Sequence, residues 1–327
     1  LETVIFYSLA VGMARSGAGV TSYTYAVLGR GVAGTLALNL LSPWSVGLAF
    51  STNSLKQLLK FGVPYQLNTF LAVIKDRFTN LLLFKIIGSD GLGILGWAQT
   101  WSQKPLRLIM DNFTKVTFPA LSRLQDNVEA RKKALEKSLF FSTSLIFPAL
   151  FIFAILAKPL IMLIPRYSKW EPALFPLYFY LFSAALAAIS TPLTNALNAI
   201  GKIKTTFYLM IMWTALTLIL MPLFAYHFNY LGVAYATGII ALTSIVPIAV
   251  TRKFIKFDLL DSFLKPLFSS TVTAVLVFVV SSSLDGLTAI ILSLLIAGIS
   301  YPLLVILISG KEVITETKQL VQKAIHP

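Results

Sequence analysis

The sequence has no cysteine, only two histidines and few charged residues. The absence of cysteine excludes disulfide bonds, thiol catalysis and metal sites built from thiolates. The two histidines, His227 and His326, are far apart in the chain, so we expect neither a metal centre nor histidine-based catalysis. We also expect no cofactor and no catalytic residue.

Acidic residues are scarce as well. The chain has 13 Asp and Glu against 27 Lys and Arg, which gives a formal net charge of +14. A basic excess can indicate nucleic-acid binding, but these basic residues are spread over short loops between apolar runs, without a basic arm interleaved with aromatics. Membrane topology explains this pattern better, because loops on the cytoplasmic side of a membrane are enriched in Lys and Arg. Nucleic acid is not an expected partner.

What the sequence has in abundance is apolar residues. It is 57% hydrophobic and 12% charged, with a mean hydropathy of +0.80, which is typical of an all-α polytopic membrane protein. The apolar runs predict ten transmembrane helices, at residues 1–15, 23–41, 61–87, 91–121, 138–157 and 172–201, two within 205–250, and at 266–284 and 287–309.

The spacing of these segments predicts five parts. Residues 1–42 are expected to be the last two helices of a first six-helix bundle, 43–60 an amphipathic cytoplasmic linker, 61–250 a second six-helix bundle, 251–310 an extra helix pair and 311–327 a cytoplasmic tail. The sequence starts without methionine inside an apolar run, so we expect a fragment that lacks the front of the first bundle. Repeated bundles are common in transporters, where the substrate site lies between the repeats.

Two of the apolar segments carry charges in their middles. The first has Lys75, Asp76 and Arg77, and the second has Lys104, Arg107, Asp111 and Lys115. On a helix, Thr100 and the four charged residues of the second segment fall within about 80° of one another. A charge at the centre of a bilayer costs at least ~2.5 to 3.5 kcal/mol, so this stripe must face other helices or a water-filled cavity.

The stripe has two interpretations. Arg107 with Asp111 and Asp111 with Lys115 are i,i+4 pairs that can neutralise each other inside a packed bundle. Pairing leaves a remainder, however, because the stripe sums to +2 and the three charges of the first segment add +1. We therefore predict an anion site with Lys75, Arg77, Lys104, Arg107 and Lys115 as substrate-binding residues. Asp76 and Asp111 are candidates for proton or sodium coupling or for ion pairing.

Other residues in the same segments bear on the site. Gln66, Asn68, Thr69, Thr79, Asn80, Gln99, Thr100 and Gln103 either line a wet cavity or make ordinary hydrogen bonds between helices. Pro105 removes a backbone hydrogen bond inside the striped helix, which predicts a gating hinge or a static bend. Gly91, Gly93 and Gly96 spell G-x-G-x-x-G, but no strand precedes them, so nucleotide binding is not expected.

Several stretches resemble one family. Residues 88–100 (GSDGLGILGWAQT), Pro105 and residues 118–126 (FPALSRLQD) are similar to the polysaccharide and O-antigen flippases of the multidrug/oligosaccharidyl-lipid/polysaccharide exporter superfamily. Residues 59–64, 170–177 and 198–202 and Asp76 fit the same resemblance, whereas Ile164-Pro165-Arg166 stands where a glycine is common. The resemblance implies that the chain is the last ten of fourteen helices.

The resemblance also implies a function. It suggests a multi-pass transporter of the cytoplasmic (inner) membrane that flips an undecaprenyl-pyrophosphate-linked oligosaccharide by alternating access, with the bilayer, a polysaccharide polymerase and glycosyltransferases as partners. The alternatives are a flippase for a lipid-linked peptidoglycan precursor and a multidrug or cation exporter of the same superfamily. A membrane-embedded polymerase or ligase fits least well, since the longest expected external loop, residues 157–171, has no paired carboxylates.

Overall fold

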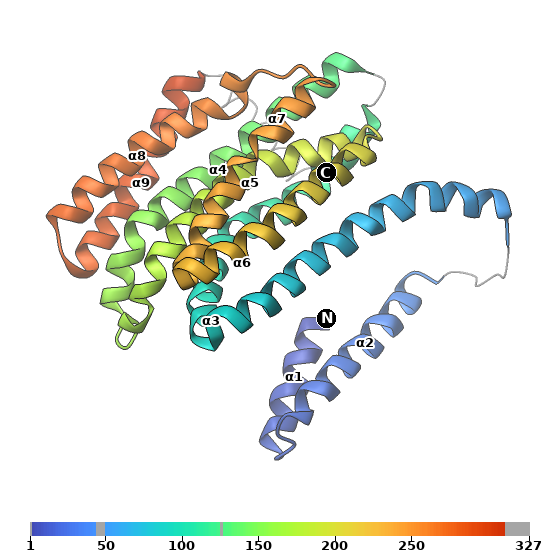
Figure 1. Cartoon of the computed structure of the whole chain (residues 1–327), viewed down its shortest axis with the longest axis horizontal. Helices are drawn as coiled ribbons and strands as arrows, with labels where there is room; N and C mark the ends of the chain where they lie inside the picture. Colours follow the sequence, from blue (N-terminus) through green and yellow to red (C-terminus); the bar gives the residue numbers. More distant parts are fainter. Residues whose placement is uncertain (1, 44–49, 125–126, 311–327) are drawn as a thin grey trace. The chain divides into compact units, whose positions relative to one another are not determined.

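The computed structural model describes residues 2–43, 50–124 and 127–310, and it confirms the all-α class because no β-strand occurs among them. The elements are α1 (Glu2–Arg15), α2 (Thr21–Leu41), α3 (Thr52–Arg123), α4 (Val128–Leu163), the 3₁₀ turn η1 (Ser168–Ala173), α5 (Leu174–Ala199), α6 (Ile203–Leu242), α7 (Ile245–Arg252), the π-helical turn η2 (Leu260–Leu264), α8 (Lys265–Ser283) and α9 (Gly286–Ser309) (Figure 1). The whole of the expected tail, residues 311–327, His326 included, and residues 44–49 of the expected linker lie outside the described residues.

The chain divides into two compact units, Leu1–Leu58 and Leu59–Pro327. In the first unit, α1 and α2 form an antiparallel pair joined by a turn in which Gly17 and Gly19 adopt positive φ. Arg30 Nε of α2 lies 3.3 Å from Glu2 Oε2 of α1.

In the second unit, α3 is two helical segments separated by one residue. Gly88 has φ 70° and ψ −173°, a backbone conformation that is essentially restricted to glycine, and the chain changes direction sharply there (Figure 1). One part of the expected linker is not separate from the helix that follows it. Residues 52–60 continue as helix into the first charged segment, because Gly88 is the only residue within α3 that has non-helical backbone angles.

Helix α6 is interrupted in the same way at Asn229, which has φ 55° and ψ −144°. The two parts come so close that a Cβ added to Gly232 would lie 1.9 Å from the carbonyl oxygen of Phe224. Only glycine allows this backbone approach, so the break and the small residue belong to one feature.

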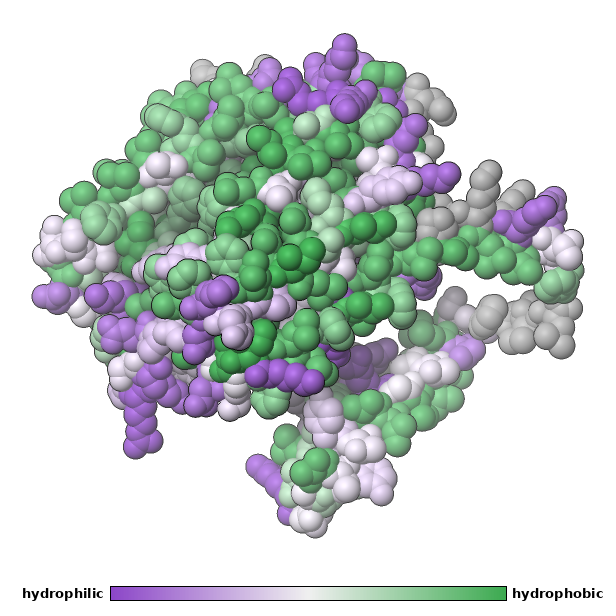
Figure 2. Space-filling model, viewed as in Figure 1, coloured by the Kyte–Doolittle hydropathy of each residue, from purple (hydrophilic) through white to green (hydrophobic). Residues whose placement is uncertain are grey.

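Six helical stretches in the described part of the chain are long and apolar enough to cross a membrane. They are Thr69–Arg123, Val128–Leu163, Ser168–Ala199, Ile203–Arg252, Leu260–Ser283 and Gly286–Ser309. Figure 2 shows apolar side chains over most of the visible outer surface of the second unit, with polar side chains gathered towards the helix ends. Together these features are those of a multi-pass membrane protein.

The C-terminal pair, α8 and α9, packs against α4. The Tyr301 hydroxyl of α9 donates a hydrogen bond of 2.6 Å to the Ser144 carbonyl of α4. The loop before the pair is anchored to the same helix, since the Asp258 backbone N–H donates to Glu136 Oε1 over 2.7 Å. Ile255 and Phe257 of this loop are 1% and 2% exposed, so a segment that the sequence suggests is a solvated basic loop is partly a packing element.

Candidate functional site

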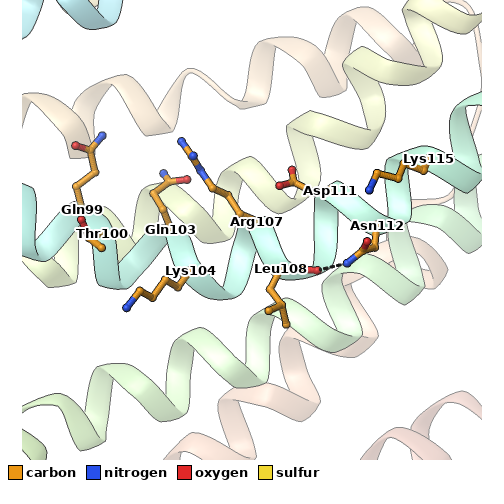
Figure 3. A pocket seen from close by; sticks show the side chains of 9 residues that line it. All are labelled: Gln99, Thr100, Gln103, Lys104, Arg107, Leu108, Asp111, Asn112 and Lys115. Atoms are coloured by element: carbon orange, nitrogen blue, oxygen red, sulfur yellow. Dashed lines mark hydrogen bonds between the residues drawn. The ribbon is translucent and has the colours of Figure 1, made fainter. Parts of the chain in front are cut away.

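A groove of about 780 Å³ runs along the second half of α3. It is lined by Gln99, Thr100, Gln103, Lys104, Arg107, Leu108, Asp111, Asn112 and Lys115 (Figure 3). All five members of the predicted stripe are in this set. In Figure 3, Gln99, Gln103 and Arg107 project from one side of the helix and Lys104 and Leu108 from the adjoining side. The charged face predicted from the sequence is therefore the floor of a groove.

The opposite face of the same helix explains this orientation. Its buried residues are Leu95, Ala98, Ser102, Leu106 and Met110, which follow one another at spacings of three and four and pack into the core of the unit. At 100° per residue, their centre lies about 160° from the centre of the charged stripe. Burying this apolar face turns the stripe into the groove without any further interaction.

The predicted i,i+4 ion pairs are absent from this structure. In the described part of the chain, Arg107, Asp111 and Lys115 form neither an ion pair nor a side-chain hydrogen bond. Asn112 is satisfied separately, since its Nδ2 donates to the Leu108 carbonyl over 2.9 Å (Figure 3). The groove therefore presents three cations and one carboxylate whose hydrogen-bonding groups are available to a ligand.

Lys104 is held differently from the other cations. Its Nζ lies 3.7 Å from the centroid of the Trp101 ring, in a cation–π contact. The ring is fixed in turn, because Trp101 packs against Phe153 of α4 with ring centroids 6.0 Å apart. Trp97, one turn earlier, stacks on Trp170 of η1 at 5.6 Å. Aromatic packing against α4 and η1 thus sets the position of this end of the groove.

A second cavity, of about 320 Å³, lies within the same unit. It is lined by Lys75, Asp76, Thr79, Asn80, Leu83, Gln99, Gln103, Tyr180, Ser183, Thr217, Met221, Thr237 and Ile240. These residues come from both halves of α3, from α5 and from both halves of α6. Gln99 and Gln103 line the groove as well, so the two spaces share a wall. We refer to this space as the inner cavity.

The structure separates the predicted residues into three groups. Lys104, Arg107, Asp111 and Lys115 line the groove, while Lys75 and Asp76 line the inner cavity, where Lys75 Nζ lies 3.6 Å from Asp76 Oδ1. Arg77 is exposed and lines neither space. The sequence predicts that all these cations meet in one site. The structure instead distributes those that line a space between the groove and the inner cavity.

The structure also shows where the other predicted residues lie. Thr79, Asn80, Gln99, Thr100 and Gln103 line one or both spaces, whereas Gln66 and Thr69 line neither, and the Asn68 side chain lies outside the described residues. The helix continues through Pro105 without a break. The proline has therefore not produced an open hinge in this conformation, and a gating role for it stays a prediction.

Sequence reasoning missed the wall of the inner cavity contributed by α5 and α6. Tyr180 and Ser183 are three residues apart on α5, and Thr217, Met221, Thr237 and Ile240 lie on the two halves of α6. The signal was a polar residue recurring at helical spacing inside runs that otherwise look uniformly apolar. In the described residues no three Asp, Glu, His or Cys side chains gather to hold a metal ion.

Comparison with known proteins places this geometry in a family. A family model described as "Polysaccharide biosynthesis protein" matches residues 1–174, more than half of the 327 residues. The chain belongs to this family. The sequence resemblance to a polysaccharide-related family is thereby confirmed.

Two curated relatives are similar over part of the family region. An uncharacterized membrane protein in the cps region of Klebsiella pneumoniae is 26% identical over 150 residues, 46% of this chain and 31% of that protein. The lipopolysaccharide biosynthesis protein WzxC of Escherichia coli (strain K12) is 24% identical over 161 residues, 49% of this chain and 32% of WzxC. The matched segments thus span about a third of the length of either relative.

One solved structure shares the fold. The lipid II flippase MurJ, in an inward closed conformation, superposes with a TM-score of 0.67 over 93% of this chain and 65% of the MurJ chain, at 18% sequence identity. At this identity the likeness shows the fold alone.

Proposed function

We propose that this family member flips an undecaprenyl-pyrophosphate-linked oligosaccharide, such as an O-antigen or other lipopolysaccharide repeat unit, from the inner to the outer leaflet of the cytoplasmic membrane by alternating access. The observation that carries the proposal is the groove on α3, in which Lys104, Arg107 and Lys115 face one carboxylate and form no ion pair among the described residues. The name of one curated relative, a lipopolysaccharide biosynthesis protein, supports the same cargo.

The charges of groove and cargo are complementary. A pyrophosphate between lipid and sugar carries about two negative charges and several acceptor oxygens, and the stripe sums to +2. Arg107 is suited to a bidentate grip on one phosphate, while the ammonium groups of Lys104 and Lys115 act as point charges. Because exposed cations are costly at membrane depth, a bound anion lowers the free energy of this face.

The proposal also includes the domain organisation of the chain. If the breaks at Gly88 and Asn229 are reversals of direction across the membrane, the described helices make ten spans, with residues 61–250 as one six-helix bundle and 251–310 as an added pair. Residues 1–42 would then belong to a preceding bundle of a fourteen-helix protein. Transporters that work by alternating access are commonly built from two such repeated bundles.

The proposed orientation places the connection between α3 and α4 in the cytoplasm and the connection between α4 and α5 outside. Because the chain has no cysteine, single cysteines introduced by Asn127→Cys and Ser168→Cys are unambiguous probes, and both positions are exposed. In intact cells, an impermeant maleimide is expected to label the second variant and not the first. Labelling of the first variant alone would reverse the proposed topology.

Deleting the gene tests the proposed cargo. We expect loss of the surface polysaccharide and accumulation of its lipid-linked precursor, with peptidoglycan synthesis intact, measured by extraction of both lipid-linked pools. Lipid carrier that is trapped in the accumulated precursor slows growth. The control strain therefore also lacks the glycosyltransferase that starts the oligosaccharide.

The same experiment separates the alternatives. Under our proposal the double deletion grows normally, because no oligosaccharide is loaded onto the lipid. Lysis that persists in the double deletion would indicate a peptidoglycan precursor flippase. Normal polysaccharide with increased drug sensitivity would indicate a multidrug or cation exporter, and loss of polymer length with normal flipping would indicate a polymerase or ligase.

A further inference from the structure

The inner cavity differs from the groove in the chemistry of its wall. The only charges that line it are Lys75 and Asp76, which pair with each other at 3.6 Å. Its other polar side chains are neutral hydroxyls and amides, namely Thr79, Asn80, Gln99, Gln103, Tyr180, Ser183, Thr217 and Thr237. A wall of neutral donors and acceptors suits an uncharged, hydroxyl-rich ligand.

One of these hydroxyls is buried and lacks a hydrogen-bond partner. Thr79 is 5% exposed and its Oγ1 makes no hydrogen bond in the described structure. A buried polar atom without a partner is unfavourable, and such an atom on the wall of a cavity is satisfied when a ligand supplies the missing bond. Among the described residues that line the inner cavity, Thr79 is the one with such an atom.

The position of the cavity connects it to the anion groove. Gln99 and Gln103, one helical turn apart on α3, line both spaces, and each amide offers two donors and two acceptor lone pairs at the junction. A group bonded directly to a phosphate in the groove reaches this junction first. In the proposed cargo that group is a sugar ring.

We propose that the inner cavity is a subsite for the sugar ring next to the pyrophosphate, with preference for an uncharged hexose or N-acetylhexosamine. The inference rests on the proposed function and adds a specificity site that is separate from the cationic groove. The side chains that select the sugar are those of α5 and α6 together with Thr79, whereas Arg107 and its neighbours hold the diphosphate. A single carboxylate already paired with a lysine makes the cavity a poor cation site.

The test measures binding of two probes to the protein purified from its own cells into nanodiscs. The probes are farnesyl diphosphate and farnesyl diphosphate linked to N-acetylglucosamine, titrated by calorimetry. We expect the sugar to tighten binding roughly tenfold, the effect of one or two net hydrogen bonds. Thr79→Val keeps the shape and removes the hydroxyl, so it is expected to lose most of this gain while binding of the sugar-free probe stays unchanged.

The chain offers a matched control. Thr214 on α6 is also buried, at 8% exposed, and its Oγ1 also lacks a partner, but it does not line the inner cavity. Thr214→Val is expected to keep the full gain from the sugar. A loss of the gain in both variants, or in neither, would overturn the proposal. Ser183→Leu, which fills the cavity from α5, supplies an independent variant with the same expected loss.

Two further arms separate the possible failures. Arg107→Ala is expected to weaken both probes and to preserve the ratio between them. If Arg107→Ala leaves binding of the sugar-free probe unchanged, the groove is not the anion site that the proposed function requires. The sugar subsite is then judged separately, by the ratio of the affinities of the two probes. Titration of sodium chloride alone tests the other occupant: sodium binding that Thr79→Val abolishes, without any gain from the sugar, would make the cavity a cation site and overturn the proposal.

Discussion

Replacing Arg107 with alanine is expected to abolish export of the surface polysaccharide while leaving the amount of protein in the membrane unchanged. Export fails because the variant lacks the two hydrogen bonds to phosphate, each worth about 1.5–3 kcal/mol with a charged partner, which corresponds to a loss of roughly 100-fold or more in affinity. Abundance is preserved because Arg107 is exposed to the groove and has no ion pair to lose. Both quantities are measured in cells that carry the variant in the chromosomal gene.

Three further variants sharpen this result. Arg107→Lys keeps the charge but loses the planar fork, so we expect export well below that of the unchanged protein. Arg77→Ala removes an arginine that lines neither space, and it is expected to keep normal export. Arg107→Ala combined with Asp111→Ala is expected to stay inactive. Recovery of export in that double variant would show that the arginine only neutralises the carboxylate and never contacts the cargo.

Replacing Gly232 with alanine is expected to prevent accumulation of correctly folded protein. The new Cβ would lie 1.9 Å from the carbonyl oxygen of Phe224 and 2.4 Å from its carbonyl carbon, both backbone atoms that cannot rotate away. The two parts of α6 must therefore separate, at a cost of at least ~1–3 kcal/mol for overpacking and more where backbone has to move. Membrane abundance and the melting temperature in detergent report the effect.

Gly298 in α9 provides the matched control for this substitution. It also lies inside an apolar helix, but a Cβ added there meets no atom within 4 Å. Gly298→Ala is therefore expected to leave abundance unchanged or to raise the melting temperature slightly, because alanine favours the helix by roughly 0.5–1 kcal/mol. Equal abundance of the two variants would contradict the close approach of the two parts of α6.

The groove was predictable because it depends on the spacing of residues within a single helix. The spacing of Lys104, Arg107, Asp111 and Lys115 follows from helical geometry, and the apolar residues on the opposite face determine which way the helix turns. The ion pairs between these charges were not predictable in the same way. An i,i+4 spacing permits a contact, but whether it forms depends on side-chain rotamers, and in this structure Asp111 has no ion-pair partner among the described residues.

The inner cavity shows where sequence reasoning stops. Thr79 and Asn80 stood out as polar residues beside charges, but Ser183 and Thr237 lie in long apolar runs on other helices. Their convergence depends on which faces of α5 and α6 meet α3, which is a tertiary property that helical periodicity does not determine. The division between Arg77, exposed outside both spaces, and its neighbours Lys75 and Asp76 likewise requires the packed bundle.

The anchored loop before α8 has a consequence for motion. Because Ile255 and Phe257 are buried and Asp258 is bonded to α4, the C-terminal pair cannot swing away from α4 without exposing these side chains to water. Any tilting of α4 must then carry α8 and α9 with it as one body. The pair faces outwards with large apolar residues such as Phe268 and Leu307, which are 61% and 78% exposed. In the proposed transport cycle, the amount of lipid displaced is therefore set by the combined width of the bundle and the pair.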